Sequence, residues 1–115
     1  MTAQRALADL VDEYLLLTQN IMPSLVKQAA TQHAKAYIKK WPVRHDHCFQ
    51  RIVLDNVCGD AWYNVLPAPA YQHLDSIQAE AAISMCYKII DGEVDLSELN
   101  KRSLKWRNKQ YTFCF

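Results

Sequence analysis

Glycine is the residue that most constrains the fold of this chain, because only two glycines, Gly59 and Gly92, occur in 115 residues. Tight hairpin turns need backbone conformations with positive φ, which glycine adopts most easily. No stretch alternates apolar and polar residues as a half-buried strand does, whereas several segments repeat apolar residues at helical spacing. The chain is therefore predicted to be all-α, with about five helices.

The first two predicted helices lie in the N-terminal third. The first begins after Thr2, and Pro23 either kinks a longer helix or begins a new one. The second is predicted over 26–41, where one apolar stripe that includes His33 runs up to Pro42. These two helices are the longest of the set, and we expect them to form an antiparallel pair.

The third predicted helix begins at Asp46, whose carboxylate can cap the first turn, and ends at Gly59. Arg51 and Asp55 lie four residues apart on it and are expected to form an ion pair. Asn56, one position further on, is a candidate member of a polar network. The apolar residues of this segment form its buried face.

Two more helices follow a connector that contains two prolines. The fourth is predicted to begin with a capping box made by Asp75 and Gln78 and to end at Gly92. The fifth is predicted to begin at Asp95, with Glu98 completing a second capping box. These two helices and the third are expected to pack across the N-terminal pair.

The length of the chain is that of one domain, so residues 1–115 are predicted to form a single compact helical domain. The apolar ending YTFCF is expected to pack on the body of this domain or on a partner. The longest apolar runs are far shorter than a bilayer span, and no secretory signal is recognised. We therefore expect a cytoplasmic protein with reduced thiols and no contact with a membrane.

Charge is strongly segregated along the chain. Eight acidic residues lie between 55 and 98, where Lys88 is the single base. Bases without an acid follow at the C-terminal end, where aromatic residues accompany them, and a second basic zone spans 35–51. A row of cations beside aromatic rings is typical of nucleic-acid binding. The candidate binding residues are Lys101, Arg102, Lys105, Arg107, Lys109, Tyr111, Phe113, Lys39, Lys40 and Arg44.

A second group of candidates gathers histidine and cysteine near the middle of the chain. His45, His47 and Cys48 are candidates for a metal site or for nucleophilic catalysis. Neighbouring side chains on a helix diverge by about 100°, and Cys48 and Cys58 would stand about 15 Å apart on one helix. We therefore interpret these residues as one side of a packed helix, and we expect no cofactor.

These observations favour a small non-enzymatic helical module that binds another protein or a second copy of itself. Four aromatic residues flank the loop-rich centre of the chain, and rigid aromatic residues often anchor protein interfaces: Trp41, Trp62, Tyr63 and Tyr71. Binding of DNA or RNA through the basic C-terminal helix and the 35–51 zone is the alternative. An enzyme or metal protein that uses His45, His47 and Cys48 is the third hypothesis.

Overall fold

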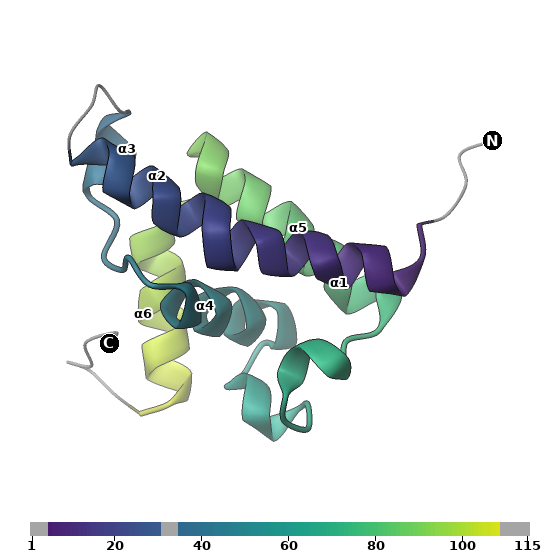
Figure 1. Ribbon diagram of the computed structural model, residues 1–115. Helices are drawn as coiled ribbons and strands as arrows, with labels where there is room; N and C mark the ends of the chain where they lie inside the picture. The colour runs from purple at the N-terminus through teal and green to yellow at the C-terminus, as the bar shows by residue number, and fades with distance from the viewer. Residues whose placement is uncertain (1–4, 31–34, 109–115) are drawn as a thin grey trace.

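The computed structural model describes residues 5–30 and 35–108, and within these ranges the chain forms helices and turns without a strand (Figure 1). The prediction of an all-α fold is confirmed. Buried side chains from all the longer helices belong to one hydrophobic core, as expected for a single domain. No helix of the described ranges is both long enough and apolar enough to cross a bilayer.

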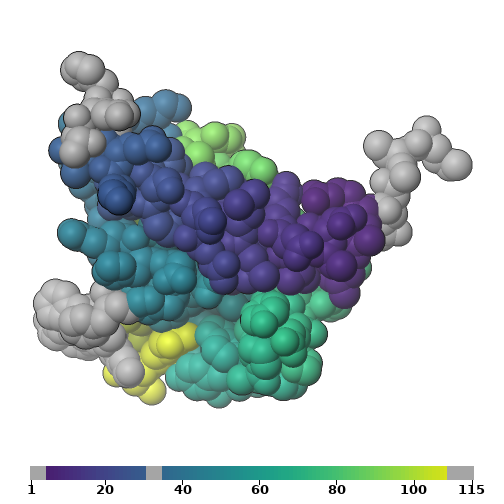
Figure 2. All heavy atoms as spheres, in the orientation of Figure 1, coloured from purple at the N-terminus to yellow at the C-terminus, as the bar shows by residue number. Residues whose placement is uncertain are grey.

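The N-terminal part is one long helical rod that crosses the molecule in Figures 1 and 2. It consists of α1 (Leu7–Leu16), a π-helical turn (Leu17–Ile21) and α2 (Met22–Ala29). Pro23 explains the wide turn, because proline has no N–H to donate and its ring collides with the carbonyl group four residues earlier. Pro23 therefore distorts a longer helix, which is one of the two outcomes that the sequence allowed.

The predicted helix over 26–41 is wrong, and so is the antiparallel pair that depended on it. Residues 26–29 belong to α2 and end the rod, whereas α3 covers only Ala36–Lys39. The stripe in the sequence joined two segments that pack in different places. Tyr37 of α3 donates a hydrogen bond from its hydroxyl group to the carbonyl oxygen of Ile90, 2.6 Å away, at the end of α5 (Ser76–Asp91). His33 lies outside the described ranges.

Helix α4 (Asp46–Cys58) lies at the centre of the fold, packed against the π turn, α5 and α6 (Leu96–Trp106). Six of its side chains are buried, including Phe49 and Ile52. The predicted cap is displaced by one residue: His45 occupies the N-cap position, and the carboxylate of Asp46 accepts a hydrogen bond from the backbone N–H of His47. Gly59 ends the helix with φ +70°, as predicted.

The ends of α5 and α6 follow most of the sequence signals. Asp75 and Gln78 form the predicted capping box, and Gly92 ends α5 with φ +79°. Asp95 is the N-cap of α6, but its carboxylate accepts from the backbone N–H of Ser97, so the predicted second capping box is not observed. The connector between α4 and α5 contains the short 3₁₀ turns η2 (Trp62–Asn64) and η3 (Ala70–Gln72). The tail at 111–115 lies outside the described ranges.

Candidate functional site

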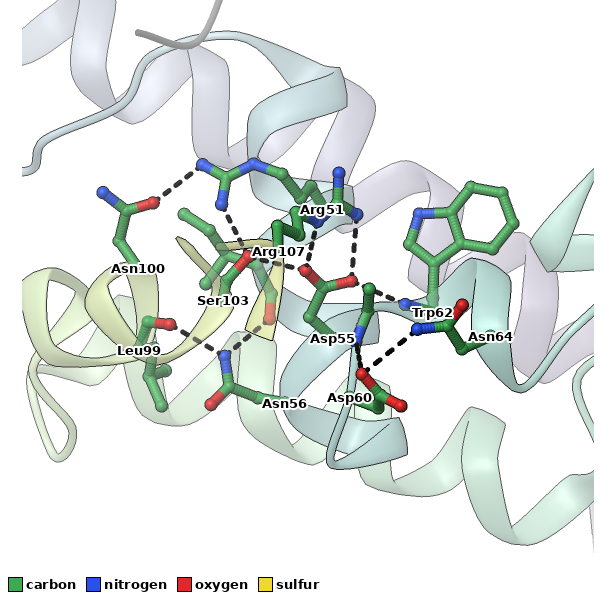
Figure 3. A network of polar contacts seen from close by, with 12 residues as sticks. Arg51, Asp55, Asn56, Asp60, Trp62, Asn64, Leu99, Asn100, Ser103 and Arg107 are labelled. Carbon is green, nitrogen blue, oxygen red and sulfur yellow. Dashed lines mark hydrogen bonds and ion pairs between the residues drawn. The ribbon is translucent and has the colours of Figure 1, made fainter. Parts of the chain in front are cut away.

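A buried carboxylate links three elements on one side of the fold. Asp55, in the last turn of α4, has no exposed surface. Arg107, just after α6, donates from Nε to Asp55 Oδ2 at 2.7 Å and from Nη2 to Asp55 Oδ1 at 3.0 Å. Ser103 Oγ donates to Oδ2 at 2.6 Å, and the backbone N–H of Trp62 donates to Oδ1 at 2.9 Å. Four donors, from α6, from the residue that follows it and from η2, thus surround one carboxylate (Figure 3).

A second arginine extends this network. Arg51 lies one helical turn before Asp55, and it donates from Nη1 to Ser103 Oγ at 2.6 Å and from Nη2 to Asn100 Oδ1 at 2.7 Å (Figure 3). Burial lowers the pKa of the Arg51 guanidinium, and the nearby positive charge of Arg107 lowers this pKa further. The two guanidinium groups are therefore close enough to influence each other, and they are joined through the Ser103 hydroxyl group and the Asp55 carboxylate.

A hollow of about 430 Å³ opens beside this network. Both arginines contribute to its wall, and the rest of the wall comes from the rod, from other residues of α4 and from the connector. Its volume falls within the range of small-molecule and side-chain binding pockets, about 300–1,000 Å³. The described residues that line it are Tyr14, Leu15, His47, Gln50, Arg51, Leu54, Trp62, Pro69, Ala70, Tyr71 and Arg107.

The hollow also adjoins the distorted part of the rod. Thr18, in the π turn, is fully buried and donates its hydroxyl group to the carbonyl oxygen of Tyr14 at 2.9 Å. Gln50, in the wall of the hollow, donates from Nε2 to Thr18 Oγ1 at 3.2 Å. The π turn is thus tied to α4 next to the hollow, and single π turns inside α-helices are frequent near functional sites.

Exposed apolar and aromatic side chains gather on the connector. Tyr63, Val65 and Tyr71 expose 54%, 48% and 39% of their surfaces. The guanidinium carbon of Arg107 lies 5.1 Å from the centre of the Tyr63 ring, and the Trp62 ring packs edge-on against Tyr63. Arg107, Trp62 and Tyr71 also line the hollow, so Tyr63, which contacts Arg107 and Trp62, lies next to it. We call Trp62, Tyr63, Val65, Tyr71 and Arg107 the aromatic face.

The structure divides the predicted basic site on α6. Lys101, Arg102 and Lys105 are exposed, as a binding face requires. Arg107 was predicted to lie near these residues, and only 16% of its side chain is exposed, because it pairs with Asp55. A cation held against a buried carboxylate does not lie on the exposed basic face of the helix, so Arg107 stays a candidate for contact with a partner from another side. Lys109, Tyr111 and Phe113 lie outside the described ranges.

The second basic zone lies around α3 and the start of α4. Lys39, Lys40 and Arg44 are exposed, but α3 lies apart from the last turn of α6 in Figure 1. Lys40 instead lines a second hollow together with the acidic residues Glu93 and Asp95. Arg51, from the second zone, and Arg107 are joined through Ser103 and Asp55.

The histidine and cysteine candidates lie in different environments. His45 and His47 are exposed, with stacked rings whose centres lie 5.8 Å apart, whereas Cys48 is fully buried. In the described part of the chain, no three histidine, cysteine or acidic side chains are placed to share a metal ion. Cys58 and Cys86 are free thiols and Cys48 is disulfide-bonded, so the expectation of reduced thiols fails at Cys48.

The ion pair predicted between Arg51 and Asp55 is also wrong, because Asp55 pairs with Arg107 and Arg51 donates to Ser103 and Asn100. The predicted network at Asn56 is confirmed: Asn56 Nδ2 donates to the carbonyl oxygens of Ile52 and Leu99. Sequence reasoning missed the hollow. One available signal was that an acid in α4 and a serine in α6 occupy positions on otherwise apolar stripes.

Comparisons with protein-family models, with curated proteins and with solved structures found no match. The site is therefore interpreted from its own geometry.

Proposed function

We propose that this chain is a small helical binding module that docks another protein through its aromatic face. The observation that carries the proposal is the position of Tyr63, Val65 and Tyr71, which are exposed beside a hollow lined by Trp62 and Arg107. Tryptophan, tyrosine and arginine are the residues most enriched among those that dominate binding energy in protein interfaces.

The network behind the aromatic face supports this role because it holds the face in place. The Asp55 carboxylate joins the backbone of Trp62 to the side chain of Arg107, and Arg107 in turn contacts the Tyr63 ring. Side chains held before binding lose less conformational entropy when a partner docks. Asp55 itself is fully buried and accepts four hydrogen bonds, which suits a supporting role better than proton transfer to a bound molecule.

Site-specific photocrosslinking in the native cell tests the proposal. A benzophenone amino acid replaces Tyr63 in one variant and Tyr87 in a matched control. Tyr87 is an aromatic residue of similar exposure, 44%, and its hydroxyl group donates to Glu13 of α1, away from the aromatic face. We expect one defined protein to be linked from position 63 and not from position 87. Equal labelling from both positions would contradict the proposal, and a link to a second copy of the chain would replace it with self-association.

Nucleic-acid binding is the second candidate, and the exposure of Lys101, Arg102 and Lys105 on one side of α6 favours it. If these cations contact phosphates, the binding constant for an oligonucleotide falls steeply with salt, with a slope of about −0.7 to −0.9 per phosphate contact. Replacing Lys101 and Lys105 by glutamine then reduces that slope by about two contacts. A slope that does not change in this variant would remove the candidate.

A further inference from the structure

Positively charged side chains lie in the wall of the hollow beside the aromatic face. Arg51 enters its wall from α4 and Arg107 from the end of α6, and His47 lies on the same wall. No aspartate or glutamate occurs among the described residues that line it. Asp55 is the carboxylate that pairs with Arg107, and it lies behind the wall rather than in it.

The rest of the wall is largely apolar. Leu15, Leu54 and Pro69 supply aliphatic surface, and Trp62 and Tyr71 supply aromatic surface. Apolar walls exclude water and strengthen an interaction between opposite charges at a given distance. A hollow of about 430 Å³ with such walls accepts a charged group together with the apolar atoms attached to it.

We propose that this hollow binds the carboxylate of an aspartate or glutamate from the partner protein, between Arg51 and Arg107. Arginine suits this role because its planar guanidinium group can bind a carboxylate with two parallel hydrogen bonds. The apolar stem of the acidic residue, or an apolar residue next to it, packs against Trp62 and Tyr71. The inference deepens the proposed function, on which it rests for the identity of the ligand.

The network explains how two arginines can be held in one wall. Ser103 Oγ accepts from Arg51 and donates to Asp55, and Asp55 accepts from Arg107. The guanidinium groups therefore have set positions, and the positive charge of Arg107 adds to burial in lowering the pKa of Arg51. An anion that enters between them adds a favourable charge interaction at a site that is already formed.

The test uses the whole chain and phenylacetate as the probe, because phenylacetate carries a carboxylate next to an apolar ring. Phenylacetamide, of nearly the same shape but neutral, is the matched control ligand, and inorganic phosphate is the competing anion. Binding is followed by the backbone amide and Trp62 indole signals in two-dimensional nuclear magnetic resonance spectra. We expect saturable shifts at Trp62 and Tyr71, with phenylacetate binding at least tenfold more tightly than phenylacetamide.

Two variants locate the binding site. Arg51→Gln removes the charge and keeps a group that can donate to Ser103, and Tyr71→Ala removes an exposed part of the wall outside the network. Phenylacetate should bind at least tenfold more weakly to the first variant and several-fold more weakly to the second. Arg102→Gln removes the same charge from the exposed side of α6 and should leave binding unchanged.

Equal binding of phenylacetamide, tighter binding of phosphate, or unchanged binding by Arg51→Gln would overturn the inference. These results are independent of the crosslinking experiment. A crosslink from position 63 without phenylacetate binding would retain the proposed function and remove the carboxylate site. Phenylacetate binding without a protein crosslink would overturn the assignment of the ligand to a partner protein.

Discussion

Arg107→Met is the most direct perturbation of the network, because it removes two of the four hydrogen bonds to Asp55 and the only charge that pairs directly with Asp55 in the described residues. The carboxylate has no exposed surface, so water cannot replace the lost partner without local rearrangement. Breaking a buried ion pair from one side costs about 3–5 kcal/mol. A domain of this size is stable by only about 5–15 kcal/mol, so the variant is expected to lose a large fraction of its stability.

The free energy of unfolding is measured by urea denaturation, followed by far-ultraviolet circular dichroism. Arg102→Met is the matched control, because Arg102 is exposed on the same helix, and it should change stability by no more than about 0.5 kcal/mol. If Arg107→Met cost less than about 1 kcal/mol, the buried carboxylate would not depend on its ion pair, and our account of the network would be wrong.

A double-mutant cycle separates the pair from its surroundings. In Asp55→Asn, the remaining side-chain oxygen can still accept from the backbone N–H of Trp62, but Arg107 loses its counter-charge. The double variant Asp55→Asn with Arg107→Met should lose less stability than the sum of the single variants. The expected coupling energy is on the order of 0.5–3 kcal/mol, and additive losses would contradict a direct interaction.

Three further predictions concern other parts of the fold. Burial raises the pKa of the Cys86 thiol from 9.0 to about 12, so the unfolded chain releases this proton at a lower pH than the folded chain does. Between pH 9 and about 12, the unchanged protein should therefore lose stability more steeply than Cys86→Ala, as measured by urea denaturation at several pH values. Gly92→Ala would place a Cβ atom 2.8 Å from the Tyr37 ring at φ +79°, whereas the Cβ atom of Gly59→Ala would meet no atom within 4 Å at φ +70°. Both variants should lose stability in thermal unfolding, and Gly92→Ala should lose more than the roughly 1 kcal/mol expected from backbone strain alone. Equal losses would refute the close contact with Tyr37. The Tyr14 hydroxyl group is buried and has no hydrogen-bond partner among the described residues. Tyr14→Phe should therefore be neutral or stabilising by up to about 1 kcal/mol in urea denaturation, and a loss of stability of more than about 1 kcal/mol would mean that the group has a partner.

Local signals in the sequence located most of the helix ends. Gly59 and Gly92 end α4 and α5 in the left-handed conformation, and Asp75 begins α5 with its capping box. Each of these signals acts within about four residues, so it can be read from the chain itself. The prediction over 26–41 failed for the opposite reason, because an apolar stripe reports that a segment is buried and does not report which neighbour buries it.

The composition and spacing of residues alone determined that this protein is helical and that its charge is segregated. They also located both ends of α4 and α5, and the start of α6, to within a residue or so. Only the tertiary structure decided the role of each charge. Arg107 follows Asp55 by 52 residues, and no local pattern distinguishes it from the exposed Lys105 two positions earlier. The crossing of α4 and α6 brings Arg107 to a carboxylate from which water is excluded, and loss of an ion pair in such a place strongly lowers stability. The same crossing leaves Lys105 in solvent, where an ion pair contributes little to stability.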